Sequence, residues 1–292
     1  MCQSTTGNCN CPVKEDRLEV HKREGFETQL CLDFINNRLK VKSYSGSNMP
    51  ELARYLIDVA ANNELGKILF NVRERDALEL KAEGYILEGK YPSFFNGVTA
   101  LGYSYFVDQA RRESRYWSNE EEILQSILGK PRKESSGRSL PGELSMRVAV
   151  SDDAKPLAQL YRKIFSTYPS PLLDSGYIEE VMTSHVLFAV VFKDDVPVSA
   201  ASADMDIKNG NAEITDCATL PDYRGQGLLT YLIRFLEKEM DSRNIGCLYS
   251  LARAGSYGMN ASLYNLGYSF SGRFINNCHI GGRYEDMNLW IR

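Results

Sequence analysis

One loop and two carboxylates have the residue types and spacing that could carry chemistry. Residues 212–232 read AEITDCATLPDYRGQGLLTYL, in which an apolar strand runs through Arg224-Gly225-Gln226-Gly227 into an amphipathic helix. Glycine lets backbone N–H groups converge without Cβ obstruction, and the first turn of a helix offers unpaired N–H groups at its positive end. The loop therefore predicts a pyrophosphate site. An ordinary strand-to-helix turn is the alternative reading of the same glycines.

The carboxylates Glu213 and Asp216 stand on the strand before the loop. An alkyl-ammonium group has a pKa near ~10.4, so an amine must lose a proton before it can attack. A carboxylate can take that proton, directly or through water. Because side chains alternate along a strand, we expect at most one of the two to face the site. Cys217 follows Asp216 directly, has no adjacent His and is a poor nucleophile.

The elements expected around this loop give a mixed α/β arrangement. Apolar periodicity predicts strands near 144–150, 186–192, 198–205, 212–219 and 248–251, with two more starting at Tyr268 and Tyr284. Helices are expected near 152–164, 177–184, 228–243 and 260–265. The predicted order is β-α-α-β-β-β-α-β-α-β-β.

A linker divides the chain into two parts. Residues 129–142 (GKPRKESSGRSLPG) are dense in Gly, Pro, Ser and charge. We expect a flexible, Cys-containing tail at 1–24, an N-terminal domain at 25–128 and a C-terminal domain at 143–292. Cys9-Asn10-Cys11 has the look of half a metal site, but no second Cys or His pair follows at ligand spacing, so we expect no metal.

Composition argues against several classes of function. The 292 residues carry a net charge of −4, which gives no reason to expect nucleic-acid binding. The longest apolar run, 186–192, is far shorter than the ~20 residues of a membrane helix, and residues 1–12 lack the pattern of a secretory signal. We therefore expect a cytoplasmic protein that does not bind membranes. The oligomeric state stays open, with a homodimer as one option.

The C-terminal half resembles the GNAT N-acetyltransferase superfamily. RGQGLL stands where that family has its coenzyme A loop, and Asn260-Ala261-Ser262-Leu263-Tyr264-Asn265-Leu266-Gly267-Tyr268 matches the family's Asn…Ala…Leu-Tyr…Gly-Phe/Tyr element. Leu229 departs from the family's Gly or Ala, although its N–H remains. The resemblance implies an α/β fold with a GNAT-type mixed, mostly antiparallel sheet flanked by helices. It also implies acetyl-coenzyme A (acetyl-CoA) as co-substrate.

The resemblance also assigns roles. Glu213 is the first candidate for the catalytic base and Asp216 the second, while Tyr264 would protonate the departing thiolate in a direct transfer within a ternary complex. Core packing is the alternative for Tyr264. Asn260 is expected to cap its helix, with contact to the pantetheine arm as a secondary role. The expected cofactor-binding residues are Ala218, Thr219, Leu220, Arg224, Gly225, Gln226, Gly227, Leu228, Leu229 and Asn260.

The two parts of the chain resemble each other. Residues 67–72 parallel 247–252, and Gly84 to Gly89 parallels Gly267 to Gly272. We therefore expect 25–128 to be a smaller α/β domain, a partial and degenerate GNAT-like repeat. It lacks the Gly-x-Gly pair, so it should not bind coenzyme A; it would extend the sheet, pack on the catalytic domain or close the acceptor pocket. An unrelated small α/β domain is the alternative.

A narrower resemblance points to the acceptor. Segments such as GYILEGKYPSFF at 84–95 and FSTYPSP at 165–171 look like the beta-lysine N-acetyltransferase family. That likeness implies synthesis of Nε-acetyl-β-lysine, a compatible solute. Another small amine or a protein amine is the alternative acceptor, and a non-catalytic coenzyme A-binding sensor is the alternative class. Arg273 is a candidate for the substrate carboxylate, and the candidates for the rest of the pocket are Tyr168, Asp174, Tyr177, Asp204 and Asp206.

Overall fold

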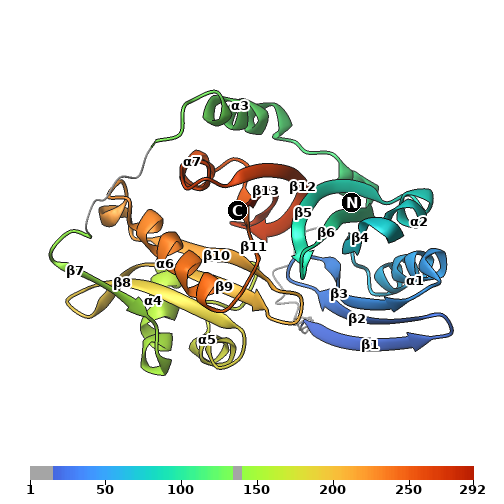
Figure 1. Cartoon of the computed structure of the whole chain (residues 1–292), viewed down its shortest axis with the longest axis horizontal. Coiled ribbons are helices and arrows are strands. Elements are labelled where there is room, and N and C mark those ends of the chain that lie inside the picture. The colour runs from blue at the N-terminus through green and yellow to red at the C-terminus, as the bar shows by residue number, and fades with distance from the viewer. Residues whose placement is uncertain (1–15, 134–139) are drawn as a thin grey trace, which may run out of the picture.

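The computed structural model describes residues 16–133 and 140–292, and within them thirteen strands form one sheet (Figure 1). The strand order is β1-β2-β3-β4-β6-β5-β12-β13-β11-β10-β9-β8-β7. The N-terminal half supplies β1 (Arg17–Arg23), β2 (Phe26–Asp33), β3 (Arg38–Gly46), β4 (Lys67–Arg73), β5 (Ile86–Phe95) and β6 (Val98–Phe106). The C-terminal half supplies β7 (Leu144–Val148), β8 (Val186–Lys193), β9 (Val196–Asp206), β10 (Asn211–Thr219), β11 (Cys247–Arg253), β12 (Ser269–Ile280) and β13 (Arg283–Ile291).

The helices lie on both faces of the sheet. They are α1 (Met49–Asn62), α2 (Ala77–Ala82), α3 (Trp117–Leu128), α4 (Ala154–Ile164), α5 (Ser175–Met182), α6 (Leu228–Ser242) and α7 (Tyr257–Asn265). The predicted order of the C-terminal elements and the α/β fold class are therefore confirmed. The predicted tail is corrected at its end, because Arg17–Arg23 pairs with β2 as a strand. Cys9 and Cys11 lie outside the described residues.

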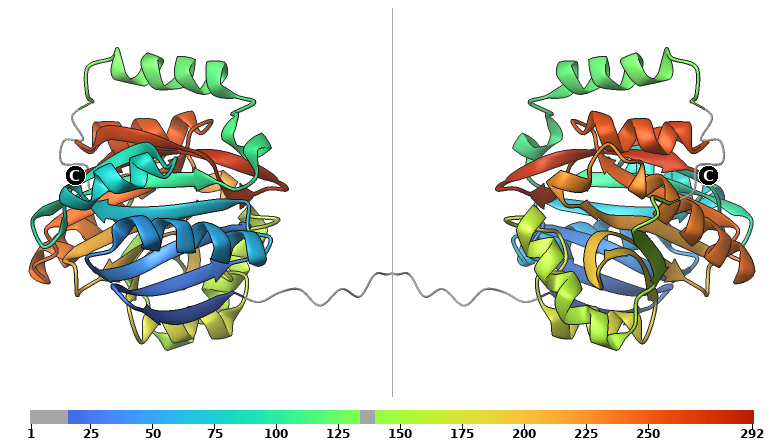
Figure 2. Two further views of the ribbon diagram at one scale, coloured as in Figure 1. Left: turned by 90° about the vertical axis from the view of Figure 1, so that its right-hand side faces the viewer. Right: turned by 90° about the vertical axis from the view of Figure 1, so that its left-hand side faces the viewer.

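Apolar helix faces explain how the layers form. α6 carries Leu232, Ile233 and Leu236 at helical spacing, and these fully buried side chains share a core with Ala212 and Ile214 of β10. α1 and α2 cover the corresponding face of the N-terminal strands. Figure 2 shows α3 standing over α7, and Leu124 of α3 belongs to the same core as α6. This helix, assigned by sequence to the N-terminal domain, thus packs against the C-terminal half.

Strand pairing repeats in the two halves. β2 and β3 pair antiparallel, β3 and β4 parallel, and β4 with β6 and β6 with β5 antiparallel. The same pattern joins β9 to β10, β10 to β11, β11 to β13 and β13 to β12. The centre of the sheet is therefore the junction between β5 and β12, and strands at equal distance from it correspond to each other.

Two glycines make that junction. Gly89 of β5 pairs with Gly272 of β12, and these are equivalent positions of the two sequence repeats. A Cβ added to Gly272 would overlap the Glu88 carbonyl oxygen, and one added to Gly89 would lie 2.8 Å from a Leu289 methyl carbon. Gly272 is needed because the two backbones approach too closely for a side chain, and Gly89 because the Leu289 and Phe274 side chains fill the space beside it.

A buried ion pair ties the halves together beside this junction. The Lys67 side chain of β4 is 0% exposed, and its Nζ lies 2.7 Å from the Glu88 carboxylate of β5. Lys67 also donates to the Ile275 carbonyl of β12, and Glu88 accepts from the Ile275 N–H. Burial lowers the pKa of Lys67 to about 8, against the opposing effect of Glu88. The pair is therefore desolvated, and both of its members are hydrogen-bonded to Ile275 of β12.

Lys67→Met is expected to lower the free energy of unfolding by about 3–5 kcal/mol, because it leaves the Glu88 carboxylate buried without its cation. The double variant Lys67→Met/Glu88→Gln removes both charges and should recover part of that loss. Urea unfolding followed by circular dichroism measures both. Equal stability of the single variant and the wild type would contradict the structural role of the pair.

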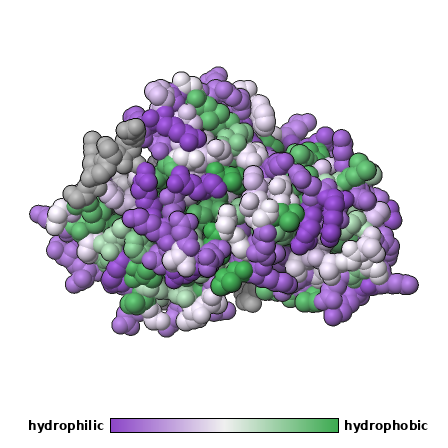
Figure 3. All heavy atoms as spheres, in the orientation of Figure 1, coloured by the Kyte–Doolittle hydropathy of each residue, from purple (hydrophilic) through white to green (hydrophobic). Residues whose placement is uncertain are grey.

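The surface adds two observations. The face seen in Figure 3 is mostly polar, with apolar side chains in small separate groups rather than one continuous patch. No helix in the described part of the chain is long and apolar enough to cross a membrane.

Candidate active site

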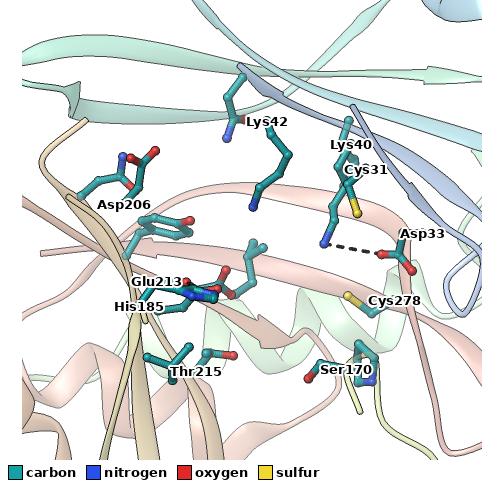
Figure 4. A pocket seen from close by; sticks show the side chains of 18 of the residues that line it. Cys31, Asp33, Lys40, Lys42, Ser170, His185, Asp206, Glu213, Thr215 and Cys278 are labelled. Carbon is teal, nitrogen blue, oxygen red and sulfur yellow. Dashed lines mark ion pairs between the residues drawn. The ribbon is translucent and has the colours of Figure 1, made fainter. Parts of the chain in front are cut away.

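A cavity of about 1000 Å³ lies between the two halves of the sheet. Its walls come from β3 on one side, from β9 and β10 on the other, and from β12 and the loop at 168–172 (Figure 4). Aromatic side chains form part of its lining, with the Tyr91 and Tyr249 rings 5.2 Å apart between centroids. The prediction that the N-terminal part extends the sheet and closes a pocket agrees with this arrangement.

Glu213 faces this cavity from β10. Its neighbours Ala212 and Ile214 point to the opposite face and are buried under α6, so strand alternation turns Glu213 inward. Burial, followed by repulsion from Asp204, raises the pKa of Glu213 from 4.5 to about 7. A carboxylate with that pKa is partly ionised at neutral pH yet basic enough to accept a proton.

Asp216 lines the same cavity, which corrects the expectation that only one of the two carboxylates would. The β9–β10 register shifts between Thr215 and Ala218, and Asp216 has φ +52°. This β-bulge breaks the alternation on which the expectation was based. Burial raises the pKa of Asp216 to about 6, although hydrogen bonds from Ser202 (2.6 Å) and Tyr168 oppose the rise. Asp216 is therefore held in place by two hydroxyl groups.

The wall opposite these acids is basic, and sequence reasoning missed it. Lys40 and Lys42 of β3 reach into the cavity across from Glu213 and His185 (Figure 4). Lys40 Nζ lies 3.5 Å from the Asp33 carboxylate, which Arg38 also binds at 2.7 Å. These cations hold the pKa of Asp33 at about 2 despite its burial. The alternating pattern Arg38-Leu-Lys-Val-Lys42 could have predicted this basic wall, because alternate residues of a strand lie on the same face.

The expected pocket residues divide into two groups. Tyr168, Tyr177, Asp204 and Asp206 line the cavity. Asp174 does not; its carboxylate caps α5 by accepting from the Gly176 N–H. Arg273 does not line the cavity either, so its expected role in binding the substrate carboxylate is wrong.

Irregular pairing of β12 explains where Arg273 points. The β12–β13 register shifts on both sides of the segment that holds it. Its guanidinium donates to Asn288 and Glu121 and lies 4.7 Å from the centroid of the Trp117 ring. Arg273 therefore anchors α3 instead of facing the cavity.

β10 and β11 separate beside Glu213. Their parallel pairing covers only Asn211 to Glu213, opposite Cys247 to Tyr249. β10 continues along β9 at Ala218 and Thr219, and β11 continues along β13. The edges of β10 and β11 that face each other beyond Glu213 are thus without strand partners. Ala218, Thr219 and Leu220, expected to bind the cofactor, lie at the end of β10 on this gap.

The glycine loop follows directly. Gly225 and Gly227 have φ +78° and +76°, the left-handed region that favours glycine, and a Cβ at either would meet no atom within 4 Å. Gly227 stands at the N-cap of α6, where no side chain caps the helix. The loop thus leaves open space before the N-terminus of a 15-residue helix, which fits an anionic diphosphate. Arg224 and Gln226 are exposed there, Leu228 is buried and Leu229 is half-buried.

Asn260 has a different role from the one expected. α7 begins at Tyr257 with Ser256 as its N-cap, so Asn260 is inside the helix. Its amide nitrogen donates to the Arg253 and Ser256 carbonyls, and its oxygen accepts from Asn288 and Trp290. All four hydrogen-bonding positions of the amide are used within the protein. Asn260 therefore fixes α7 to β11 and β13. Its side chain has no free hydrogen-bonding position for a cofactor.

Tyr264 lies on α7, outside the cavity that Glu213 lines. Its hydroxyl donates to the Lys130 carbonyl at 2.9 Å, and its ring packs near Trp290. The catalytic-acid role stays a prediction, and it would require this hydrogen bond to be exchanged.

The fold, the separated strands and the glycine loop are those of an acetyltransferase, and the chain belongs to the GNAT family. Residues 155–268 match the model of the Acetyltransferase (GNAT) family, a span that includes Glu213, the loop and Tyr264. The protein is an N-acetyltransferase and its co-substrate is acetyl-CoA.

Curated relatives extend the similarity over nearly the whole chain. The chain is 38% identical to a beta-lysine N(6)-acetyltransferase of Methanosarcina mazei, over 83% of this chain and 96% of the relative. It is 36% identical to the N-acetyltransferase YodP of Bacillus subtilis, over 94% and 99%. A beta-lysine N(6)-acetyltransferase of Methanococcus maripaludis is 31% identical over 88% and 93%. The expected resemblance to the beta-lysine enzymes is thus confirmed.

Proposed function

We propose that this enzyme acetylates the terminal amine of a small amino acid, β-lysine, to give N6-acetyl-β-lysine, a compatible solute. The observation that carries the proposal is the charge arrangement of the cavity: Glu213, Asp216 and Asp204 on one wall, Lys40 and Lys42 on the other. β-Lysine has a carboxylate and two ammonium groups, so it needs both signs of charge in its site. The two relatives named for this activity support the same acceptor.

In the proposed mechanism Glu213 takes the proton of the acceptor ammonium, directly or through one water. Its raised pKa of about 7 suits this task, because the carboxylate is a stronger base than an ordinary one and is still partly ionised at neutral pH. Asp216 sits on the bulge three residues further on, where Ser202 and Tyr168 fix its carboxylate. It would orient the amine toward Glu213 by accepting a hydrogen bond.

The cofactor would be held by the chain's backbone. The N–H groups after Gly225 and Gly227 would bind the diphosphate at the start of α6, and the unpaired edge of β10 at Ala218 to Leu220 would bind the pantetheine arm. Acetyl-CoA supplies the activated acetyl group, and direct transfer to the amine in a ternary complex needs no nucleophile from the protein. Cys217 is poorly suited to be such a nucleophile, because burial raises the pKa of its thiol well above the usual range.

The N-terminal half is proposed to be a degenerate copy of the acetyltransferase fold. Its strands pair in the same pattern as β9 to β13, and Gly89 and Gly272 are equivalent positions. α1 starts after Asn48, whose side chain accepts from the Glu51 N–H. The N-terminus of α1 is therefore capped by a side chain, whereas the N-terminus of α6, where the diphosphate is proposed to bind, is not. The N-terminal half should consequently not bind coenzyme A.

The acceptor is tested by measuring thiol release with β-lysine, lysine and polyamines. We expect kcat/KM to be highest for β-lysine, with the acetyl group on its terminal nitrogen when the product is examined by NMR. A higher kcat/KM for a polyamine would contradict the proposed acceptor. Binding of acetyl-CoA without turnover of any amine would instead favour a non-catalytic sensor.

A further inference from the structure

Strand registers identify the residue of the N-terminal half that corresponds to Glu213. In β10 the third residue, Glu213, pairs with Asp204 of β9 and with Tyr249 of β11. In β3 the third residue, Lys40, pairs with Cys31 of β2 and with Leu69 of β4. The antiparallel pairing and the parallel pairing of these strands both make Lys40 equivalent to Glu213. The N-terminal half therefore has a lysine, Lys40, at the position where the C-terminal half has the proposed base.

Each of the two strands also has a bulge a few residues after this position. β3 has a register shift at Lys42, between the pairs of Val41 and Ser43, as β10 has one at Asp216 and Cys217. The strands β3 and β10 stand at equal distances from the central β5–β12 junction. Their inward-facing residues consequently meet across one cavity, with Lys40 at the position that Glu213 has in the other half (Figure 4).

Of the cations on this wall, Lys42 has the charge that is least compensated. Arg38 is buried and bonds Asp33, the Asn277 carbonyl and Cys278. Lys40 shares Asp33, and the Arg73 guanidinium lies 4.4 Å from the centroid of the Phe95 ring. Lys42 forms no ion pair with any residue in 16–133 or 140–292, and its ammonium points into the cavity.

We propose that Lys42, supported by Lys40, binds the carboxylate of the acceptor. The degenerate half of the sheet thus selects an amino acid over a plain diamine. The inference rests on the proposed function, since it concerns the acceptor of the same site. The physical reason is that a charge-assisted hydrogen bond forms only with a ligand that carries the charged group, so it discriminates between ligands with and without that group.

The test compares β-lysine with its decarboxylated analogue, a diaminopentane that keeps both amines. Lys42→Met should lower kcat/KM for β-lysine by about 10- to 100-fold and that for the diamine by less than about threefold. Lys42→Glu should go further and make the diamine the better acceptor, because a second acid repels a carboxylate and attracts an ammonium. KM for acetyl-CoA should stay the same in both.

Lys81→Glu is the control, because it makes the same charge change at an exposed residue of α2 outside the cavity. It should leave both acceptors unaffected. If the Lys42 variants lose the same factor on β-lysine and on the diamine, Lys42 does not bind the carboxylate, whatever the acceptor. If the wild type prefers the diamine, the proposed function itself is wrong, so the two failures are distinguishable.

Discussion

Glu213→Gln is expected to lower kcat/KM by about 100- to 10 000-fold, because the amide cannot take the proton of the acceptor ammonium. A base acts in its deprotonated form, so wild-type kcat/KM should rise with pH through the Glu213 pKa of about 7. The variant should lose this rise. Thiol release measured from about pH 5.5 to about pH 8.5, roughly 1.5 units either side of that pKa, shows both effects.

Two further variants make this result specific. Glu180→Gln alters another acid of the cavity wall, on α5, and should change kcat/KM by less than about threefold. Asp216→Asn tests the second candidate, whose pKa of about 6 would give a rise at lower pH. If Glu213→Gln kept a rise of kcat/KM with pH, centred near the Asp216 pKa, while Asp216→Asn removed it, Asp216 would be the base. Retention of full activity by both would contradict the mechanism.

Gly227→Ala is expected to weaken binding of acetyl-CoA by about 10- to 100-fold. The added Cβ has no protein atom within 4 Å, so it would extend into the open space before α6 where the diphosphate is proposed to bind. The residue must also hold φ +76°, which favours glycine, so the backbone is strained as well. Calorimetric titration with acetyl-CoA measures the loss of affinity.

Gly246→Ala is the matched control for this change. Gly246 is exposed and has open space at its Cβ, as Gly227 does, but its φ lies outside the left-handed region. Affinity for acetyl-CoA should stay within about twofold of the wild type. Thermal unfolding of both variants separates lost affinity from lost stability. If Gly227→Ala folded normally and bound acetyl-CoA as the wild type does, the loop would not hold the diphosphate.

Local patterns were sufficient for the elements of the C-terminal half. Helix periodicity at Leu232, Ile233 and Leu236 and the apolar run at 186–192 each reflect burial against a neighbouring layer, so they predict α6 and β8. The glycine loop was predictable because left-handed backbone excludes most side chains. The repeat was visible because both halves keep the same order of strands and helices.

Where the sequence failed, a non-local contact decided the outcome. Strand alternation predicts that Glu213 and Asp216 point to opposite faces of the sheet. A bulge in β10 against β9 instead lets both side chains face the same cavity. Asn260 looked like a helix cap, but a helix that starts three residues earlier makes it an internal residue bonded to Trp290. Arg273 looked available to a carboxylate, but irregular pairing of β12 directs it to α3.

The sequence by itself determined the fold class, the glycine loop before α6 and the strand that carries Glu213, because these depend on residues that are near one another in the chain. Only the tertiary structure decided what faces Glu213. Lys42 is 171 positions away in numbering (213 − 42), and it reaches the same cavity because the sheet continues through Gly89 and Gly272. Spacing along a chain carries no information about which strands meet across a sheet.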